Sequence, residues 1–414
     1  MLLPRRYARL SRLPRTLLFD ILPLFLVVYA VLEVLWIRAN LDAADIAAKA
    51  SSVVTPKGEK IFISSIHLHD EQLLRWHWNK ALLALVESLG PEDVHVSIYE
   101  SNSLDNTKGA LRELGDDLEK IGAKHTIELD ETTRPDTLRA GNPETDPGYV
   151  MTSRGEKELR RIPYLAKLRN KTLKPLEDLE KDGRRFDKVI FLNDVVFKAE
   201  DVITLLATNS GKYAAACALD FKVAPLFYDT FALRDADGHE PLSISFPYFR
   251  SATSRRAFTS GNPVVPVSSC WNGIVAMDAT PFYTMLKQLR FRGFDDGLAK
   301  DHVEGSECCL IHADNPYSSA HGVFVNTAVR VAYNKDAYEA VNPENGPWVS
   351  SWDILKGMWK NRSMRLFKVL GDRKELAVRA RVKHWEKISG KDEPGDYCAI
   401  DEMQVLRMDG WAHV

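Results

Sequence analysis

The sequence predicts an α/β fold with a central, mainly parallel sheet, behind one N-terminal transmembrane helix. From Lys60 onward, short apolar runs alternate with segments of helical spacing, and strands that are connected by helices form parallel sheets. Of the 414 residues, 45% are hydrophobic and 27% are charged, which is the composition of a folded globular protein with a sizeable core. An apolar run at residues 17–37 precedes this pattern.

Charge and cysteine content exclude several classes of protein. The formal net charge is -2, whereas nucleic-acid-binding domains usually present a basic face. Five cysteines in 414 residues do not make a disulfide scaffold, and at least one of them must remain unpaired. No pair of cysteines has the CxxC spacing of structural zinc sites. The sequence therefore indicates a globular domain of ordinary charge.

The apolar run at residues 17–37 is long enough to cross a bilayer as a helix, which takes roughly 20 residues. Five arginines precede it, so the positive-inside rule places residues 1–16 in the cytosol and the rest of the chain across the membrane. Residues 38–59 are small and polar and are expected to form a short stem. A cleaved signal peptide is the alternative, but the run is too long for one and ends in Trp36-Ile37-Arg38, a poor cleavage site.

The first half of the remaining chain reads as three strands and two helices. A strand is expected at 60–66 and a helix at 70–90, with Asp70 as its N-cap and Gly90 as its stop. Further elements follow in the order strand 94–100, helix 103–121 and strand 124–129.

The second half is less regular. A polar stretch at 130–148 is rich in Pro, Gly and Thr and is expected to be a loop. A long helical segment at 155–181 is interrupted by Pro163 and Pro175. Next come a strand at 186–197, a short helix at 200–208, a strand at 213–219 and a strand-like segment at 265–279. Residues 347–414 are expected to form a basic, helical C-terminal extension, whose charges belong to a solvated face or contact an anionic membrane or glycan.

The motifs of several enzyme classes are missing. No GxGxxG follows the first strand, and no Walker loop, GxSxG elbow or HExxH motif is present. What remains is a set of acidic and amide residues at strand ends, where parallel sheets bind ligands. The most informative strand end is Leu192-Asn193-Asp194-Val195.

Five strings of residues in order resemble the fungal alpha-1,3-mannosyltransferase family, glycosyltransferase family 69, which includes the cryptococcal mannosyltransferase and the capsule-associated proteins. The strings are RIPYLAKLRN (161–170), FDKVIFLNDVVF (186–197), LDF…FYDTFALRDADG (219–238), VPVSSCWNG (265–273) and EGSECCLIHAD (304–314). The resemblance implies a GT-A-like domain at 60–346, the donor GDP-mannose, a divalent cation such as Mn2+, an alpha-mannoside acceptor, and a type II Golgi membrane enzyme with a lumenal catalytic domain.

Chemistry suggests roles for the residues within these strings. A hard divalent cation that bridges two phosphates needs carboxylate and other oxygen or nitrogen ligands, so Asp194 and His312 are predicted to bind the metal. Many GT-A enzymes carry Asp-x-Asp at this position, and here Leu192 stands in place of the first aspartate. The structural alternatives are a loop carboxylate for Asp194 and a buried histidine for His312.

The other residues in these strings are predicted to bind the donor, to act in catalysis or to bind the acceptor sugar. Arg161 and Arg169, eight residues apart on one helix, are predicted to reach the diphosphate, or else are surface arginines. Glu307 is predicted to be the active-site acid, or else a structural carboxylate at the start of a helix. Asp235 is a second catalytic candidate, or else the structural partner of an arginine. The remaining predictions are donor contacts by Asn193, Ser64 and Ser65, and sugar contacts by Trp271, Asn272 and Asp314, with Gly273 allowing close approach.

The reaction that the resemblance implies converts an alpha donor into an alpha linkage and is therefore retaining. A double displacement needs a carboxylate under the anomeric carbon, whereas front-face attack lets the leaving phosphate take the acceptor proton. We favour front-face attack. Two alternative functions remain. The same scaffold could use another nucleotide-sugar donor, or the protein could be a non-catalytic factor in glycan assembly or export. The presence of both Asp194 and Glu307 favours an enzyme.

Overall fold

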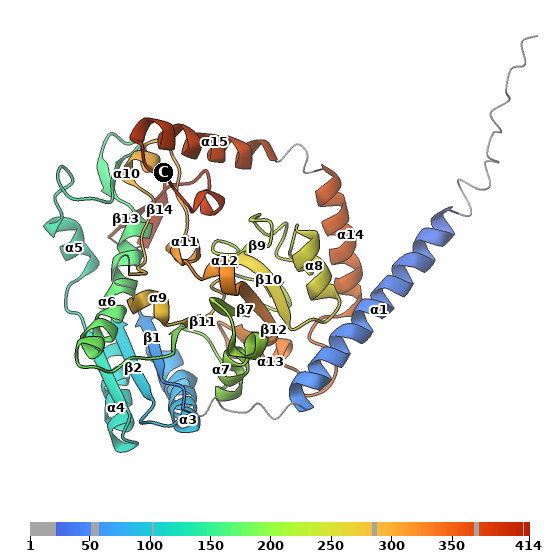
Figure 1. Cartoon of the computed structure of the whole chain (residues 1–414), viewed down its shortest axis with the longest axis horizontal. Coiled ribbons are helices and arrows are strands. Elements are labelled where there is room, and N and C mark those ends of the chain that lie inside the picture. Colours follow the sequence, from blue (N-terminus) through green and yellow to red (C-terminus); the bar gives the residue numbers. More distant parts are fainter. Residues whose placement is uncertain (1–21, 51–57, 102, 284–287, 368–371, 409) are drawn as a thin grey trace, which may run out of the picture.

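A computed structural model describes residues 22–50, 58–101, 103–283, 288–367, 372–408 and 410–414. They form one body around a mixed β-sheet, from which a long N-terminal helix projects (Figure 1). The expected cytosolic tail, residues 1–16, lies outside the described residues, as does the start of the apolar run.

Helix α1 (Leu22–Ala50) is apolar and long enough over residues 22–49 to cross a membrane. It continues without a break through residues that the sequence predicts to be stem. Its buried side chains form one stripe, which includes Val34, Ile37 and Leu41, and Arg38 donates a hydrogen bond to the backbone oxygen of Val349. The expectation of a stem is therefore corrected for residues 38–50, because they are helical and pack against the domain.

The N-terminal half of the sheet is parallel, as expected. Its order is β3-β2-β1-β6, and all neighbouring strands run in the same direction. Every residue of β2 is buried, which is typical of a strand covered on both faces. The strands are β1 (Ile61–His67), β2 (Val94–Glu100), β3 (Lys124–Leu129) and β6 (Lys188–Leu192).

The C-terminal half of the sheet is mixed. Strand β11 lies antiparallel between β6 and β7, while β12 runs parallel to β7. The strand-like segment 265–279 is in fact two strands, β10 and β11, which a turn at Trp271-Asn272-Gly273 separates. The strands are β7 (Ala215–Val223), β8 (Leu226–Phe227), β9 (Arg234–Asp235), β10 (Val264–Ser269), β11 (Ile274–Asp278) and β12 (Val323–Ala332).

Helices cover both faces of the sheet, which confirms the α/β class. Alternate residues of β1 belong to different cores: Ile61 and Ile63 pack with α3, α4 and α7, whereas Phe62 packs with α6. The helical elements of this part are α2 (Glu71–Leu73), a π-helical turn (Leu74–Trp78), α3 (Asn79–Leu89), α4 (Thr107–Lys120), α6 (Arg161–Lys181), α7 (Ala199–Leu206) and a 3-10 turn (Thr208–Gly211).

The region around α6 differs from the sequence prediction in two ways. The expected loop at 130–148 contains helix α5 (Arg134–Ala140), which a capping box between Thr133 and Asp136 starts. The expected break in the following helix is absent from the described chain: α6 starts at Arg161, so Pro163 falls in its first turn, and Pro175 lies within it. The residues before α6 form a hairpin of β4 (Tyr149–Met151) and β5 (Lys157–Leu159).

The segment after residue 346 is part of the same body. The disulfide Cys309–Cys398 links it to α11, and a shared core joins Leu298 and Leu310 to Val382 of α15. The expected boundary between 346 and 347 is thus no structural boundary. The last elements are α8 (Ala252–Thr259), α9 (Thr280–Tyr283), α10 (Asp296–Lys300), α11 (Glu307–Asp314), α12 (Ser318–His321), α13 (Lys335–Val341), α14 (Ser351–Phe367), α15 (Asp372–Ser389), a 3-10 turn (Asp396–Cys398), β13 (Gln404–Arg407) and β14 (Gly410–His413).

Candidate active site

Asp194 lies just beyond the carboxyl end of β6, where the backbone leaves the sheet. The turn is fixed on both sides: Asn193 donates its backbone N–H to the oxygen of Gly273 at 2.9 Å, and the indole of Trp78 donates to the backbone oxygen of Asn193 at 3.0 Å. Gly273 has φ of +82°, and a Cβ there would lie 2.6 Å from a methyl group of Val331. The predicted role of Gly273 in close approach of a sugar is therefore corrected, because protein atoms fill that space.

The Asp194 carboxylate is half-buried and lies near a second carboxylate. Burial first, and then the negative charge of Asp70, raise the pKa of Asp194 to about 6. Asp70 is predicted to be a helix cap, but its side chain makes no capping bond and instead pairs with Nδ1 of the buried His67 at 2.9 Å. Sequence reasoning missed both residues as members of the site, although His67 ends β1 and Asp70 follows three residues later.

Two further carboxylates lie beside the same end of the sheet. Asp220, on β7, is fully buried, and burial together with the nearby charge of Asp229 raises its pKa to about 8. The hydroxyl of Tyr333 and the backbone N–H of Asp229 donate to the Asp220 carboxylate, both at 3.2 Å. Burial also raises the pKa of Asp229. These residues were missed, although both aspartates stand in the string LDF…FYDT that carries the family resemblance.

Arg169 links three other predicted site residues, two of them directly. Its Nε donates to Glu307 at 2.9 Å, and its guanidinium lies 4.5 Å from the centre of the Trp271 ring. The indole of Trp271 in turn donates to the side-chain oxygen of Asn193 at 3.2 Å. A continuous path therefore links the turn at Asn193 to Glu307 through a stacked arginine. Trp271 is only 2% exposed, which corrects its expected role as a platform for a sugar ring.

Glu307 is the first residue of α11 and is held in place on two sides. Ser306 caps the helix by accepting the N–H of Cys308. The carboxylate is 2% exposed, and besides Arg169 it accepts a weak bond from the thiol of Cys308 at 3.4 Å. Burial raises the pKa of Cys308 well above its usual range, so this thiol stays protonated. Glu307 is thus a buried anchor for Arg169.

The other predicted donor residues make contacts within the protein. Arg161 is on the same side of α6 as Arg169, but it donates to the side chain of Gln404 and stacks on Trp411 of the C-terminal hairpin. Ser64 bonds to Thr172 at 2.5 Å, and Ser65 donates to the backbone of Leu192 at 2.6 Å. These serines join β1 to α6 and β6, and we assign them no direct contact with a donor.

Three predicted contacts with sugar or acceptor are also structural. Asp235 accepts the backbone N–H groups of Asp237, His239, Arg250 and Ser251, which orders its own loop. Asp314 forms an ion pair with Arg292 at 2.5 Å. Asn272 is fully buried and donates to the backbone oxygen of Asp229 at 3.1 Å. We therefore assign none of them a catalytic role.

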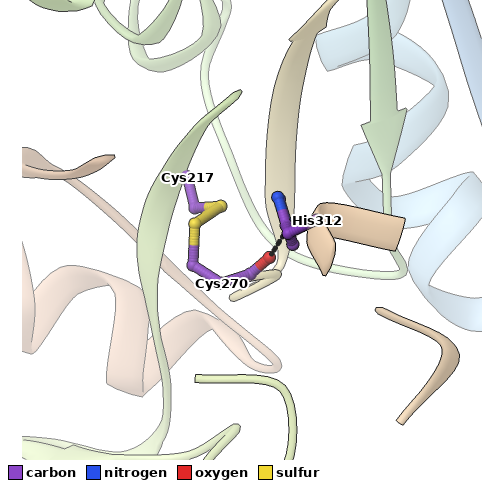
Figure 2. A group of neighbouring side chains, drawn as sticks. All are labelled: Cys217, Cys270 and His312. Atoms are coloured by element: carbon purple, nitrogen blue, oxygen red, sulfur yellow. Dashed lines mark hydrogen bonds between the residues drawn. A yellow bond between two sulfur atoms is a disulfide. The ribbon is translucent and has the colours of Figure 1, made fainter. Parts of the chain in front are cut away.

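His312 is buried beside a disulfide. Figure 2 shows that its ring approaches Cys217 and Cys270, a grouping with the spacing of a metal site. The two sulfur atoms are bonded to each other, however, and the Nε2 of His312 is 2.7 Å from the backbone oxygen of Cys270. Burial lowers the pKa of His312 to about 4. Sulfurs in a disulfide are not thiolate ligands, so the structure supports no metal at His312.

A cavity of about 860 Å³ lies between α6, the loop after β3 and the carboxyl end of β2. Ile66, which lines a small cleft beside Arg169, pairs in the sheet with Tyr99, which lines the cavity. The cavity and the Arg169 site are therefore neighbours. Polar lining residues include Tyr99, Ser101, Asp130, Tyr164, Lys167 and Lys171.

The site has the donors that a divalent cation prefers. Asp194, Asp220 and Asp229 all have a raised pKa, chiefly because they are buried, so a cation bound beside them would stabilise their ionised form. Oxygen donors of this kind suit Mg2+ or Mn2+. The site thus combines an acidic cluster, a fixed arginine and a cavity at the carboxyl ends of neighbouring strands.

Comparison with known proteins gives one family. The profile described as cryptococcal mannosyltransferase 1 matches residues 60–314, more than half of the chain. A curated relative, alpha-1,3-mannosyltransferase CMT1 of Cryptococcus neoformans, is 29% identical over 282 residues. The match covers 64% of this chain and 56% of the relative, so the chain spans little more than half of that protein's length.

The matches among solved structures have low sequence identity and low TM-scores. The mannosyltransferase PcManGT from Pyrobaculum calidifontis, in complex with GDP-Man and Mn2+, is 12% identical, with a TM-score of 0.36 over 87% of this chain and 88% of that one. S. aureus TarS is 10% identical, with a TM-score of 0.38 over 86% of this chain and 60% of its own.

Proposed function

The chain belongs to the cryptococcal mannosyltransferase 1 family, with the GT-A-like α/β fold expected of it, and from this premise we propose that it transfers mannose from GDP-mannose to an alpha-mannoside. The observation that carries the proposal is the path from Asn193, the neighbour of Asp194, through Trp271 and Arg169 to Glu307, next to buried carboxylates. Such a site can hold a cation and a diphosphate together, which is what release of a nucleoside diphosphate requires.

The carboxylates fit the divalent cation that the family implies. Asp194 is the first ligand in the proposal, because it is half-buried and accepts no hydrogen bond from a side chain in the described part of the protein. Asp220 and Asp229 add negative charge from β7. A bound Mn2+ would supply Lewis-acid stabilisation of the leaving diphosphate. Without a cation, burial makes the ionised form of these carboxylates costly.

Arg169 is the residue proposed to bind the diphosphate. Glu307 fixes its Nε and the Trp271 ring fixes its plane, so the remaining guanidinium N–H groups point in a set direction. The nucleoside part of the donor would then occupy the neighbouring cavity, where Tyr164 offers an aromatic ring and Lys167 and Lys171 offer positive charge. The acceptor would approach from the open side of the Asp194 site.

The linkage and stereochemistry follow the relative's name and the chemistry of the donor. An alpha-1,3 product from an alpha donor needs net retention. Glu307 is buried against Arg169, and Asp235 is engaged by backbone N–H groups, so neither is free to attack an anomeric carbon. This supports front-face attack, in which the leaving phosphate takes the acceptor proton and Arg169 stabilises the developing negative charge.

The location proposed for the chain is a Golgi membrane, with α1 as a single span and the catalytic domain in the lumen. One support is that α1 is apolar, yet only 17% of its most apolar 18-residue window is buried against the rest of the protein. The other is the five arginines that precede the apolar run in the sequence.

Binding of GDP tests the donor and the metal together. Calorimetric titration of the full chain in detergent should show GDP binding that requires Mn2+ and is tighter than binding of UDP. Because a proton competes with the metal for Asp194, whose pKa is raised to about 6, Mn2+ affinity should fall up to about tenfold per pH unit below pH 6. Metal-independent binding of GDP would contradict the assignment of Asp194, and preference for UDP would indicate another donor.

A further inference from the structure

Helix α14 presents an apolar, aromatic face that no described part of the protein covers. Trp352, Trp359 and Leu366 recur every seven residues, which places them along one side of the helix, and Phe367 lies next to them. Leu366 and Phe367 are 76% and 74% exposed. Lys356 and Lys360 flank this line and are exposed as well. Tryptophan and lysine around an apolar stripe are typical of helices at a membrane surface.

The position of α14 beside α1 determines what this face meets. The two helices contact each other, and Figure 1 shows them close together near the start of α14 and separating in this view toward its end. They run in opposite directions, because Arg38 contacts Val349 just before α14, whereas Arg362, one turn before its end, contacts Tyr29 and Glu33. The end of α14 is therefore alongside the apolar part of α1.

The depth of this contact follows from helix geometry. Tyr29 lies eight residues before the end of the apolar run at Ile37, or about 12 Å along the helix axis. The hydrocarbon core of a bilayer is about 30 Å thick, so a helix that spans residues 17–37 carries Tyr29 well below the membrane surface. Leu366 and Phe367 come one turn after Arg362 and so reach a similar depth.

The charges on this contact are paired in a way that suits such a depth. Glu33 is the one acidic residue in the described part of the apolar run, and it forms an ion pair with Arg362, which also stacks on Tyr29 and Trp359. Lys356 pairs with Asp353 near the start of the helix, and Lys360 contacts Ser245 near its middle. The ion pair with Glu33 thus neutralises Arg362, while the exposed Arg365, one residue before Leu366, donates to the side chain of Asn361 and has a stem long enough to extend toward headgroups.

We propose that α14 is a second membrane-contact element, whose face of Trp352, Trp359, Leu366 and Phe367 enters the lumenal leaflet beside α1. The occupant of this face is lipid: the headgroups at Trp352 and the acyl chains at Leu366. This rests on the proposed membrane span of α1 but not on the donor or the reaction. Because α1 packs rigidly on the domain, the two helices fix the orientation of the active site relative to the membrane.

Three matched leucine-to-cysteine variants test this contact. Leu366→Cys is on α14, Leu24→Cys is on α1, and Leu104→Cys is the control in the segment between β2 and α4. All three leucines are exposed, and the free Cys308 is buried, so a nitroxide reagent should label only the new cysteine. The full chain is placed in vesicles of phosphatidylcholine and phosphatidylserine, and collision of each label with oxygen and with a water-soluble nickel chelate is measured by electron paramagnetic resonance.

The expected result is an oxygen-to-nickel collision ratio several-fold higher at positions 366 and 24 than at position 104. A low ratio at 366 with a high ratio at 24 would overturn the contact by α14 while leaving the span of α1 intact. Low ratios at both positions would overturn the span and the contact together. The collision ratios do not depend on mannosyl transfer. Failure of the proposed reaction would therefore be detected separately, in the transfer assay.

Discussion

Asp194→Ala is expected to reduce mannosyl transfer about a thousandfold and to remove its dependence on Mn2+. The carboxylate stands where β6 ends and is the first proposed ligand of the cation, whose charge stabilisation of a leaving diphosphate amounts to several kcal/mol. The measurement is initial rate against Mn2+ concentration, with GDP-mannose and an alpha-mannoside. GDP titration of the same variant should show loss of the metal-dependent part of binding.

Thermal unfolding separates loss of the site from loss of the fold. The folded-state pKa of Asp194 is raised above its ordinary value of 3.8, so without metal its ionised form costs stability as the pH rises through about 6. The alanine variant should therefore be at least as stable as the wild type at pH 7.5 without metal, and Mn2+ should no longer raise its Tm. Asp116→Ala, an exposed carboxylate on α4, is the matched control and should behave as wild type. Transfer at the wild-type rate by Asp194→Ala would remove this residue from the mechanism.

Glu307→Gln is expected to lower kcat roughly a hundredfold while changing GDP affinity little. The amide keeps the size of the side chain and an oxygen that can accept from Arg169, but it replaces an ion pair by a hydrogen bond to a neutral acceptor and removes the counter-charge of the guanidinium. The guanidinium then loses its fixed direction toward the developing phosphate charge, and stabilisation of this kind is worth about 10²–10³ in rate. Steady-state kinetics with saturating donor gives kcat directly.

Glu304→Gln provides a control three residues away on the same string. Glu304 is as buried as Glu307 and is paired with Arg160 at 3.0 Å, on the side of the C-terminal segment rather than of Asp194. Burial raises its pKa to about 7, so a neutral side chain is tolerated at this position better than at an ordinary carboxylate site. This variant should keep its kcat. Equal losses of kcat in both variants would indicate a general effect on packing in place of a role for Glu307.

The order of strands and helices could be predicted from the sequence because the N-terminal half alternates regularly. Strand β2 and strand β3 have the predicted bounds, and the parallel pairing follows from the helices between them. Helix α6 was harder to predict, because a proline is compatible with the first turn of a helix and its effect depends on where the helix starts. The packing of residues 38–50 and of the C-terminal segment depends on tertiary contacts that a local pattern does not contain.

The candidate site was predictable where residues stand at strand or helix ends. Asp194 and Glu307 fall on such positions, whereas Arg169 lies inside α6 and was identified through its family string, and the structure brings Arg169 and Glu307 into contact. Asp220 and Asp229 were missed because one is inside a strand and the other is in an irregular loop, so only pairing of β7 with β11 and β12 shows that they face the site. Conversely, Asp235, Asp314 and His312 look functional by residue type, yet each is occupied by contacts within the protein.

The central claim is that this domain moves mannose from GDP-mannose to an alpha-mannoside. The most direct measurement is to incubate the full chain in detergent with GDP-mannose, Mn2+ and a short alpha-mannoside, and to analyse the product by mass and linkage. The account predicts an acceptor extended by one hexose in an alpha-1,3 linkage, absent when Mn2+ is removed. A protein that binds GDP with Mn2+ yet extends no alpha-mannoside would contradict the proposed acceptor, and one that neither binds GDP nor transfers mannose would contradict the proposed enzyme.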